Sequence, residues 1–226
     1  GEHLVVETND GPLWTGGKAL WQATKGDRHL TVWWQPNVGA ARAVAGAATT
    51  YPATAFEQVH RAMGDRVRAF AIEQLGDVRE KTVWDLYAGA GETASQLARL
   101  GAKLVISVER DRRSVEEAER QQESFGRQIE RIGGSAERAV SSLRVPDLVI
   151  TNPPRTGMAA PVVAAVVARR PERVVYVSCD PATLGRDLAR FAAGSDGPAY
   201  RLGSVRAFDL FPQTAHLETV AVLERQ

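Results

Sequence analysis

Residues 82–91 read Thr-Val-Trp-Asp-Leu-Tyr-Ala-Gly-Ala-Gly, an apolar segment that ends in two closely spaced glycines. The β-branched and aromatic side chains predict a buried strand, and the residues that follow predict a helix. Glycines at such a strand-to-helix turn let a ligand approach the backbone closely, although a Gly-x-Gly pair alone is a weak signal. The turn therefore indicates a ligand site at the carboxyl end of this strand, where open α/β sheets bind their ligands.

The segments on both sides of this turn alternate between predicted strands and predicted helices. We expect further strands near 104–108, 128–132, 147–151 and 173–178. We expect helices at about 55–75, 92–100, 112–125, 136–142, 161–169 and 182–192, and a capping box from Thr54 to Glu57 opens the first of them. Two last strands, near 200–210 and 217–224, have no helix between them. This order predicts an α/β fold with a Rossmann-like, doubly wound parallel sheet and an antiparallel edge strand.

Residues 1–50 have a different pattern, with strand-like segments at 4–8, 19–23 and 29–34. They predict a small antiparallel β-rich element, followed by a loop from Gln35 through an Ala- and Gly-rich run. Four of the five tryptophans lie in this part of the chain, and three of them, Trp21, Trp33 and Trp34, fall in the strand-like segments. Stacking on nucleic-acid bases is one reading of these rings, but packing in a core is the favoured one.

The composition narrows the class of protein. The chain of 226 residues has a net charge of +1, which neither supports nor excludes nucleic-acid binding through a local basic patch. A single cysteine excludes an internal disulfide framework and a multi-cysteine metal or iron–sulfur site within this chain. Nothing resembles a signal peptide or an apolar run long enough to cross a bilayer, so we expect a cytoplasmic protein.

Glu109 ends the predicted strand that follows the glycine turn. An acid at this place can accept hydrogen bonds from the hydroxyls of a ribose, although a solvated loop acid is the alternative. Together with the glycine turn it predicts a nucleoside-binding site. The full Gly-x-Gly-x-x-Gly pattern is absent because position 94 is Ala94, so S-adenosylmethionine fits this site better than NAD.

Asn152, Pro153, Pro154 and Arg155 follow another predicted strand. The two prolines stiffen the loop and expose the Asn152 side chain, although a plain turn is also possible. Asn-Pro-Pro followed by an aromatic residue is typical of amino-methyltransferases, but here Arg155 follows. In a methyltransferase, such a loop lies between the methyl donor and the acceptor.

Cys179 stands at the end of the apolar run 174–177, just before Pro181 opens a predicted helix. A thiol at the carboxyl end of a parallel strand is a candidate nucleophile, and a small buried hydrophobic residue is the competing interpretation. Near the end of the chain, His216 and Glu218 flank Leu217, so in a strand both would point to one face.

Taken in order, these motifs resemble those of the RNA uracil-5 methyltransferases, S-adenosylmethionine-dependent enzymes that form 5-methyluridine in tRNA or 23S ribosomal RNA. The resemblance extends from about Phe56 to Glu224. It covers Phe-x-Gln at 56–58, Asp-x-Tyr-x-Gly-x-Gly at 85–91, Ser-Cys-Asp-Pro-x-Thr-Leu-x-Arg-Asp-Leu at 178–188 and Phe-Pro-x-Thr-x-His-x-Glu at 211–218.

The resemblance implies a role for each matching residue. Cys179 is expected to be the nucleophile and Glu218 the general base. The cofactor site is expected to comprise Gln58, Tyr87, Gly89, Gly91, Glu109 and Asn152. Contacts to RNA are expected from Arg155, Arg186 and His216, and no metal is expected.

The same resemblance implies how the chain is organised. Residues 51–226 are expected to form a class I methyltransferase domain, and residues 1–50 a β-rich element that is part of a truncated central domain. The amino-terminal RNA-binding barrel of many members is missing, so either RNA docking is reduced or the chain is a fragment. The expected partner is RNA, bound by a monomer that does not associate with membranes.

Three positions depart from the family pattern. His60 and Asp180 stand where Asn is usual, and Asn152 stands where the family has Asp. Asn152 is the most serious departure, because an amide donates hydrogen bonds where a carboxylate cannot.

The chemistry implied by the resemblance begins with attack of the Cys179 thiolate on C6 of uracil, which turns C5 into a nucleophile for the methyl group. Glu218 then removes the C5 proton. Two alternatives stay open. One is a base amino-methyltransferase that uses Asn152-Pro153-Pro154 and no thiol, and the other is a non-catalytic RNA-binding module of the same fold.

Overall fold

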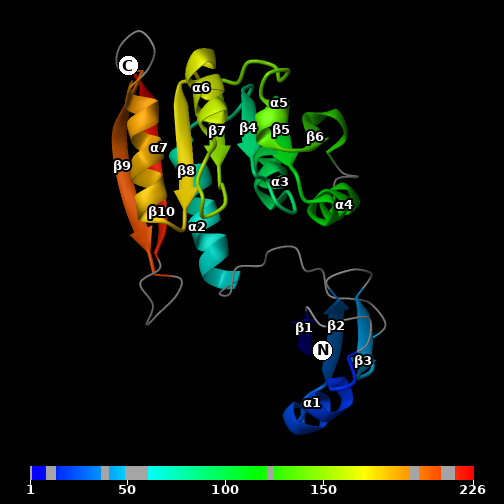
Figure 1. Cartoon of the computed structure of the whole chain (residues 1–226). Coiled ribbons are helices and arrows are strands. Elements are labelled where there is room, and N and C mark those ends of the chain that lie inside the picture. The colour runs from blue at the N-terminus through cyan, green and yellow to red at the C-terminus, as the bar shows by residue number, and fades with distance from the viewer. Residues whose placement is uncertain are drawn as a thin grey trace. The chain divides into compact units, whose positions relative to one another are not determined.

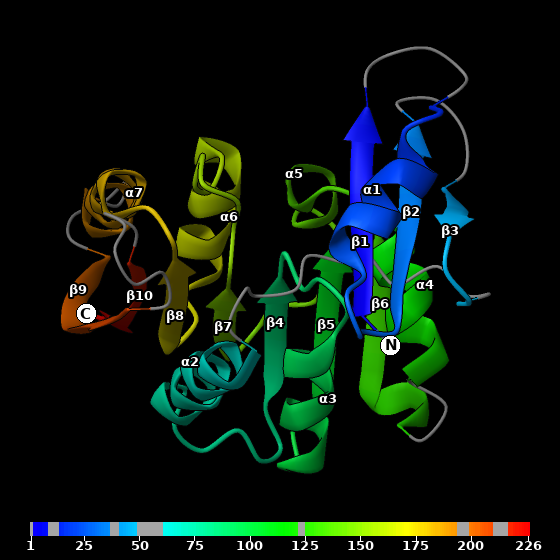
Figure 2. The ribbon, with the colours of Figure 1, turned by 90° about the horizontal axis from the view of Figure 1, so that it is seen from below.

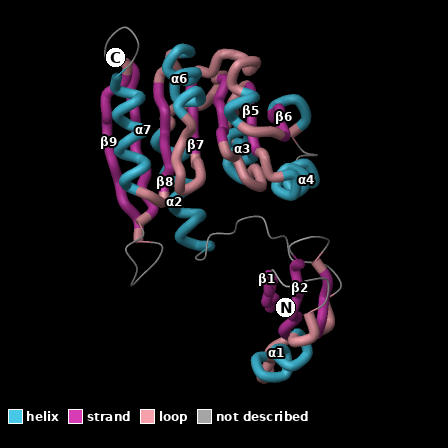
Figure 3. The backbone as a smooth tube through the Cα atoms, viewed as in Figure 1, coloured by secondary structure: helices cyan, strands magenta, loops and turns pink. Residues whose placement is uncertain are grey.

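The computed structural model describes residues 2–8, 14–36, 41–48, 61–121, 125–193, 199–209 and 217–226. The chain divides into two compact units, residues 1–54 and residues 55–226 (Figure 1). Each unit has its own sheet, as the strands drawn in magenta in Figure 3 show.

The described part of the first unit is a three-stranded sheet with one helix. Its elements are β1 (Glu2–Thr8), α1 (Gly17–Thr24), β2 (Leu30–Pro36) and β3 (Arg42–Ala45). β1 pairs with β2 in parallel, and β3 pairs with β2 antiparallel. Trp33 and Trp34 of β2 are buried, which confirms that these rings pack in a core.

Three predictions for this unit were wrong. Residues 19–23 form part of α1 rather than a strand, because Gly17, Leu20, Trp21 and Thr24 recur at helical spacing and make up its buried or half-buried side. The helix crosses over between β1 and β2, so these strands are parallel and the sheet is mixed rather than antiparallel. Of the residues predicted as a loop, Gln35 and Pro36 belong to β2, and part of the Ala- and Gly-rich run forms β3.

In the described part of the second unit, seven strands form one sheet in the order β6-β5-β4-β7-β8-β10-β9. The strands are β4 (Thr82–Leu86), β5 (Leu104–Glu109), β6 (Ile129–Gly133), β7 (Leu148–Thr151), β8 (Arg173–Ser178), β9 (Tyr200–Phe208) and β10 (Glu218–Arg225). The first five strands in this order, from β6 through β5, β4 and β7 to β8, are parallel to one another. β10 is antiparallel to both β8 and β9, between which it lies.

Helices cover both faces of this sheet (Figure 2). α2 (Arg61–Gln74) and α3 (Glu92–Arg99) pack on one face, and α5 (Ala136–Ala139), α6 (Ala160–Arg169) and α7 (Pro181–Ala193) pack on the other. α4 (Arg112–Gln121) packs against β5 and β6, and the short 3₁₀ helix η1 is Gly126–Gln128. Each face buries its own apolar cluster, one around Trp84 and Phe191 and the other around Leu97 and Val175.

The alternation predicted from the sequence is therefore confirmed as a doubly wound α/β sheet. The last two strands add the predicted antiparallel pairing, with β10 inserted beside β8 and β9 at the edge. The first helix of this unit is described from Arg61, so its predicted start and the capping box from Thr54 to Glu57 lie outside the described residues.

Candidate active site

The predicted site residues gather at one edge of the seven-stranded sheet. Parallel strands β4, β5, β7 and β8 end there, and they lead into the glycine turn, Glu109, Asn152 and Cys179. Since β10 is antiparallel to β8, it begins at this same edge, with Glu218 as its first residue. Gln58 and His216, the other predicted members, lie outside the described residues, as does His60.

The glycine turn has the backbone that its sequence predicts. Gly89 and Gly91 have φ angles of +56° and +79°, and Tyr87 also adopts a positive φ of +61°. A Cβ added to Gly89 would meet no described atom within 4 Å, so the space beside this residue is open. The turn thus presents uncovered backbone at the end of β4.

Glu109 holds the glycine turn in place. Its Oε2 accepts a hydrogen bond from the Gly89 amide at 2.8 Å, and its Oε1 accepts one from the Asp111 amide at 2.7 Å. A carboxylate offers about four acceptor positions, so further positions stay available for donors of a ligand. Gly89 and Glu109 line a small pocket together with Ser107, Val115, Ala118, Arg131 and Ile132.

Asp85 and Arg131 are two charged residues at the glycine turn that were absent from the predicted site. Burial raises the pKa of the Asp85 carboxyl to about 7, against the opposing effect of the nearby Arg131 guanidinium. The Oδ2 atom of Asp85 is buried without a hydrogen-bond partner in the part of the chain that the structure describes. The Arg131 guanidinium lies against Gly91. An acid within an otherwise apolar strand is the signal that could have identified Asp85.

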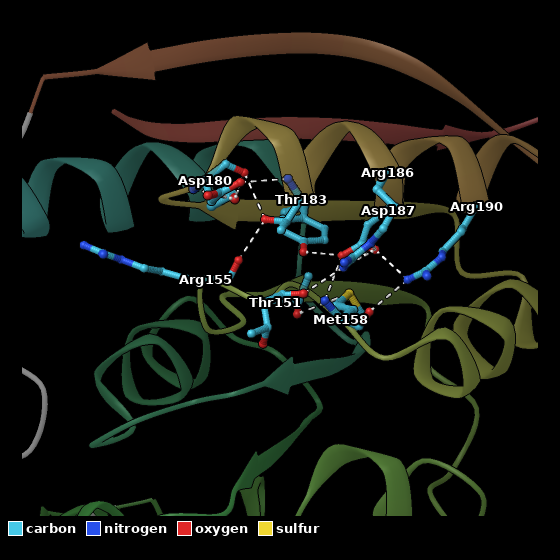
Figure 4. A network of polar contacts seen from close by, with 11 residues as sticks. Thr151, Arg155, Met158, Asp180, Thr183, Arg186, Asp187 and Arg190 are labelled. Carbon is cyan, nitrogen blue, oxygen red and sulfur yellow. Dashed lines mark hydrogen bonds and ion pairs between the residues drawn. The ribbon is translucent and has the colours of Figure 1, made fainter. Parts of the chain in front are cut away.

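The loop from Asn152 to Ala159 joins two other parts of the site. The backbone amide of Asn152 donates a hydrogen bond to the Leu86 carbonyl oxygen at 3.2 Å, which ties the end of β7 to the end of β4. The Arg155 carbonyl oxygen accepts a hydrogen bond from Thr183 Oγ1 of α7 at 3.0 Å (Figure 4). This loop therefore lies between the glycine turn and the segment that carries Cys179.

Cys179 and Glu218 are brought together by the pairing of β8 with β10. Ser178 is opposite Thr219 in the register, so the next position on each strand places Cys179 across from Glu218. Glu218 is only 2% exposed, and burial raises its pKa to about 7. A carboxyl group with this pKa is suited to accept a proton near neutral pH.

The Cys179 thiol lies between opposing charges. Burial and the charge of Glu218 raise the pKa of the thiol, whereas the nearby, positively charged Arg155 guanidinium lowers it. The raising effects prevail, so the pKa of the free thiol is above its usual value. The site thus brings together a thiol, a carboxyl group and a guanidinium that favours the thiolate.

Glu218 should make the stability of the protein depend on pH. The pKa of Glu218 is raised on folding. Its contribution to the stability of the folded protein is therefore fully present below pH 4.5 and is lost as the pH rises through about 7. We expect the free energy of unfolding of Glu218→Gln, measured in urea, to rise relative to that of the wild type by up to about 3 kcal/mol as the pH is raised from 4.5 to 8. Glu130→Gln, which changes an exposed carboxylate on β6, is the control. Parallel pH profiles of wild type and Glu218→Gln would contradict this expectation.

Arg186, a predicted contact to RNA, is engaged within the protein. Its Nε and Nη2 atoms donate to Asp187 Oδ1 at 3.0 and 2.9 Å, and Nη2 also donates to the Thr156 carbonyl oxygen at 2.8 Å. Its guanidinium is therefore directed to the loop that carries Arg155 (Figure 4).

Comparisons with known proteins identify similar sequences for the part of the chain that holds these residues. Residues 139–226, which include Cys179 and Glu218, match the family model described as tRNA (uracil-5-)-methyltransferase. The carboxyl-terminal part of the chain is thus similar to this family. The match covers the strands and helices from β7 to β10, including the segment from Asn152 to Arg155.

Similar proteins are longer than this chain. An uncharacterized RNA methyltransferase of Gloeobacter violaceus is 39% identical over 173 residues, which are 76% of this chain and 36% of that protein. Another, of Corynebacterium efficiens, is 31% identical over 234 residues, which cover all of this chain and 52% of that protein. The chain thus spans about half or less of the length of these relatives.

A solved structure shows the same fold. The tRNA (uracil-54, C5)-methyltransferase of Pyrococcus abyssi, crystallised with S-adenosyl-L-homocysteine, matches with a TM-score of 0.69 and 24% sequence identity. The match covers 98% of this chain and 56% of that one. At this identity the likeness establishes the Rossmann-like methyltransferase fold.

One departure from the family pattern has a simple structural account. Asp180 Oδ1 accepts a hydrogen bond from the Thr183 amide at 2.8 Å, which caps the first turn of α7. This bond is the main reason why the pKa of Asp180 is lowered. Because the side-chain oxygen of Asn can accept the same bond, Asp and Asn are interchangeable as caps here. Nothing in the structure explains Asn152 in place of Asp.

Within the described residues, no helix is long and apolar enough to cross a membrane. The same part of the chain has no cluster of three or more His, Cys, Asp or Glu side chains that could hold a metal ion.

Proposed function

We propose that this chain carries the methyl-transfer site of an S-adenosylmethionine-dependent enzyme that forms 5-methyluridine in RNA. The observation that carries the proposal is the pairing of β8 with β10, which places the buried Glu218 carboxyl across from the Cys179 thiol. Methylation at C5 of uracil needs a nucleophile for C6 and a base for the C5 proton, and this pair supplies both. An enzyme that methylates an exocyclic amine needs no thiol.

The residues at the glycine turn fit the cofactor. The open space at Gly89 allows close approach to the backbone, and the unused acceptor positions of Glu109 suit the hydroxyls of a ribose. The Oδ2 atom of Asp85, which has no hydrogen-bond partner among the described residues, suits the ammonium group of a methionine moiety as an acceptor. Tyr87, Gly91 and Asn152 complete the proposed set among the described residues. When bound, S-adenosylmethionine supplies an electrophilic methyl group.

The proposed reaction uses three side chains of this chain in turn. Arg155 stabilises the thiolate form of Cys179, which attacks C6 of the uracil ring and places negative charge on C5. After C5 has been methylated, Glu218 takes the proton from C5, and the electron pair left behind expels the Cys179 thiolate from C6. The raised pKa of Glu218, about 7, matches this role near neutral pH.

The proposed substrate is a uridine in a folded RNA, whose base must leave its stack to reach Cys179. The family description and the name of the Pyrococcus abyssi neighbour favour tRNA over 23S ribosomal RNA. Mass spectrometry of nucleosides from tRNA and 23S RNA incubated with the protein tests this choice. Formation of 5-methyluridine in tRNA alone is the expected result, and a methylated amine in place of 5-methyluridine would refute the proposed function.

Glu109→Ala should weaken S-adenosylmethionine binding by about 1–3 kcal/mol, because the variant loses a charged hydrogen-bond acceptor and the carboxylate that holds Gly89. Isothermal titration calorimetry measures the change, with Glu130→Ala on the neighbouring strand β6 as the control. Equal affinities of wild type and Glu109→Ala would remove Glu109 from the cofactor site.

A further inference from the structure

Asp187 is a fully buried carboxylate in the middle of α7. Its Oδ2 atom accepts hydrogen bonds from the Met158 amide at 2.7 Å and from the Tyr176 hydroxyl at 2.8 Å. Its Oδ1 atom accepts from Arg186 and from Arg190 Nη1, each at 2.9 Å. A charge without exposure to solvent is stable only with such a complete set of donors.

The same group of side chains holds the backbone of the loop between β7 and α6. Asp187 binds the amide of Met158, and Arg190 Nη1 donates to the Met158 carbonyl oxygen at 3.2 Å. Arg186 and Thr183 hold the carbonyl oxygens of Thr156 and Arg155 at 2.8 and 3.0 Å. Three consecutive turns of α7 thus fix the loop on both sides of Gly157 (Figure 4).

The fit at Gly157 is too close for a side chain. Gly157 has a φ of +73°, and a Cβ at this position would overlap with Asp187 Oδ2 and Arg186 Nη2. The loop backbone and the charged group on α7 are therefore complementary in shape as well as in hydrogen bonding.

α7 is also the helix that begins directly after Cys179, and Asp180 caps it. The helix is thus connected to the thiol at its first turn and to the Arg155 loop along its length. We infer that Asp187, with Arg186 and Arg190, acts as a positioning group that sets the Arg155 guanidinium against the Cys179 thiol. This inference rests on the proposed function, and it assigns Arg186 to the network of hydrogen bonds around Asp187 rather than to RNA.

The test uses the alkylation of Cys179 by iodoacetamide, because the full chain has a single cysteine and the reaction needs neither RNA nor cofactor. The rate follows the thiolate fraction, so its pH profile reports the pKa of the thiol. We expect Asp187→Asn and Arg186→Gln to move the profile to higher pH, in the direction of Arg155→Leu. A shift of one pH unit slows alkylation about tenfold below the pKa.

Three comparisons make this test specific. Adding Arg155→Leu to Arg186→Gln should cause little further shift, and Arg186→Lys should restore part of the profile because a lysine keeps the charge beside Asp187. Arg169→Gln is the matched control, since Arg169 also donates to backbone carbonyl oxygens but belongs to α6 and contacts Ser141. Its profile should equal that of the wild type.

A wild-type profile in folded Arg186→Gln would overturn the inference, and this variant stays informative if Asp187→Asn fails to fold, because the Arg186 side chain is 42% exposed. A change in RNA binding without a change in the alkylation profile would also overturn the inference. If Arg186 contacts a phosphate, Arg186→Gln should lower the slope of log affinity against log salt by about 0.7–0.9, whereas the inference expects an unchanged slope. Failure of the proposed function is seen separately, as methylation by Cys179→Ala.

Discussion

Cys179→Ala is expected to abolish RNA methylation, with a loss of activity on the order of 10⁴–10⁶-fold, while S-adenosylmethionine binding stays intact. The reason is that C5 of uracil is a poor nucleophile until a thiolate has added to C6. Because Cys179 is half-buried between β8 and α7 and the substitution deletes one sulfur atom, the fold should be retained. Transfer of labelled methyl groups to tRNA measures the activity, and calorimetry measures cofactor binding.

Normal turnover by Cys179→Ala would exclude the covalent mechanism. It would favour a base amino-methyltransferase that acts through the loop from Asn152 to Arg155. Loss of both methylation and cofactor binding would instead indicate a damaged site, and thermal unfolding of the variant distinguishes this case from a chemical defect.

Glu218→Gln is expected to stop the reaction after methyl transfer. An amide cannot take the C5 proton, so the bond between Cys179 and C6 should persist and a methylated protein–RNA adduct should accumulate. A denaturing gel with methyl-labelled cofactor detects the adduct as a labelled band of reduced mobility. RNA that contains 5-fluorouridine should trap the corresponding adduct in the wild type, because fluorine does not leave as a proton does.

Two variants control this experiment. Adding Cys179→Ala to Glu218→Gln should remove the band, since no covalent bond can form. Glu224→Gln changes another acid of β10 that pairs with Arg173 and Arg201 away from the site, and it should turn over normally without an adduct. Turnover by Glu218→Gln at the wild-type rate would assign the base to another residue.

The amino-acid sequence by itself determined the elements of the second unit, because apolar periodicity and glycine turns are local signals. It also led to the family through Cys179, Glu218 and the motifs between them, and the comparisons support that family. In the first unit, the short segment 19–23 was mistaken for a strand. Its few apolar residues do not distinguish the two periods, and the packing of Trp21 beside β2 decides in favour of a helix.

Only the tertiary structure decided how the site is put together. The insertion of β10 between β8 and β9 brings Glu218 to Cys179, and this register joins residues about 40 positions apart in the chain. The burial that raises the pKa of Glu218, and the network that holds Arg186 on Asp187, likewise arise from packing between elements. Local patterns identify which side chains a chain offers, whereas burial and charge pairing depend on long-range contacts that no local pattern encodes.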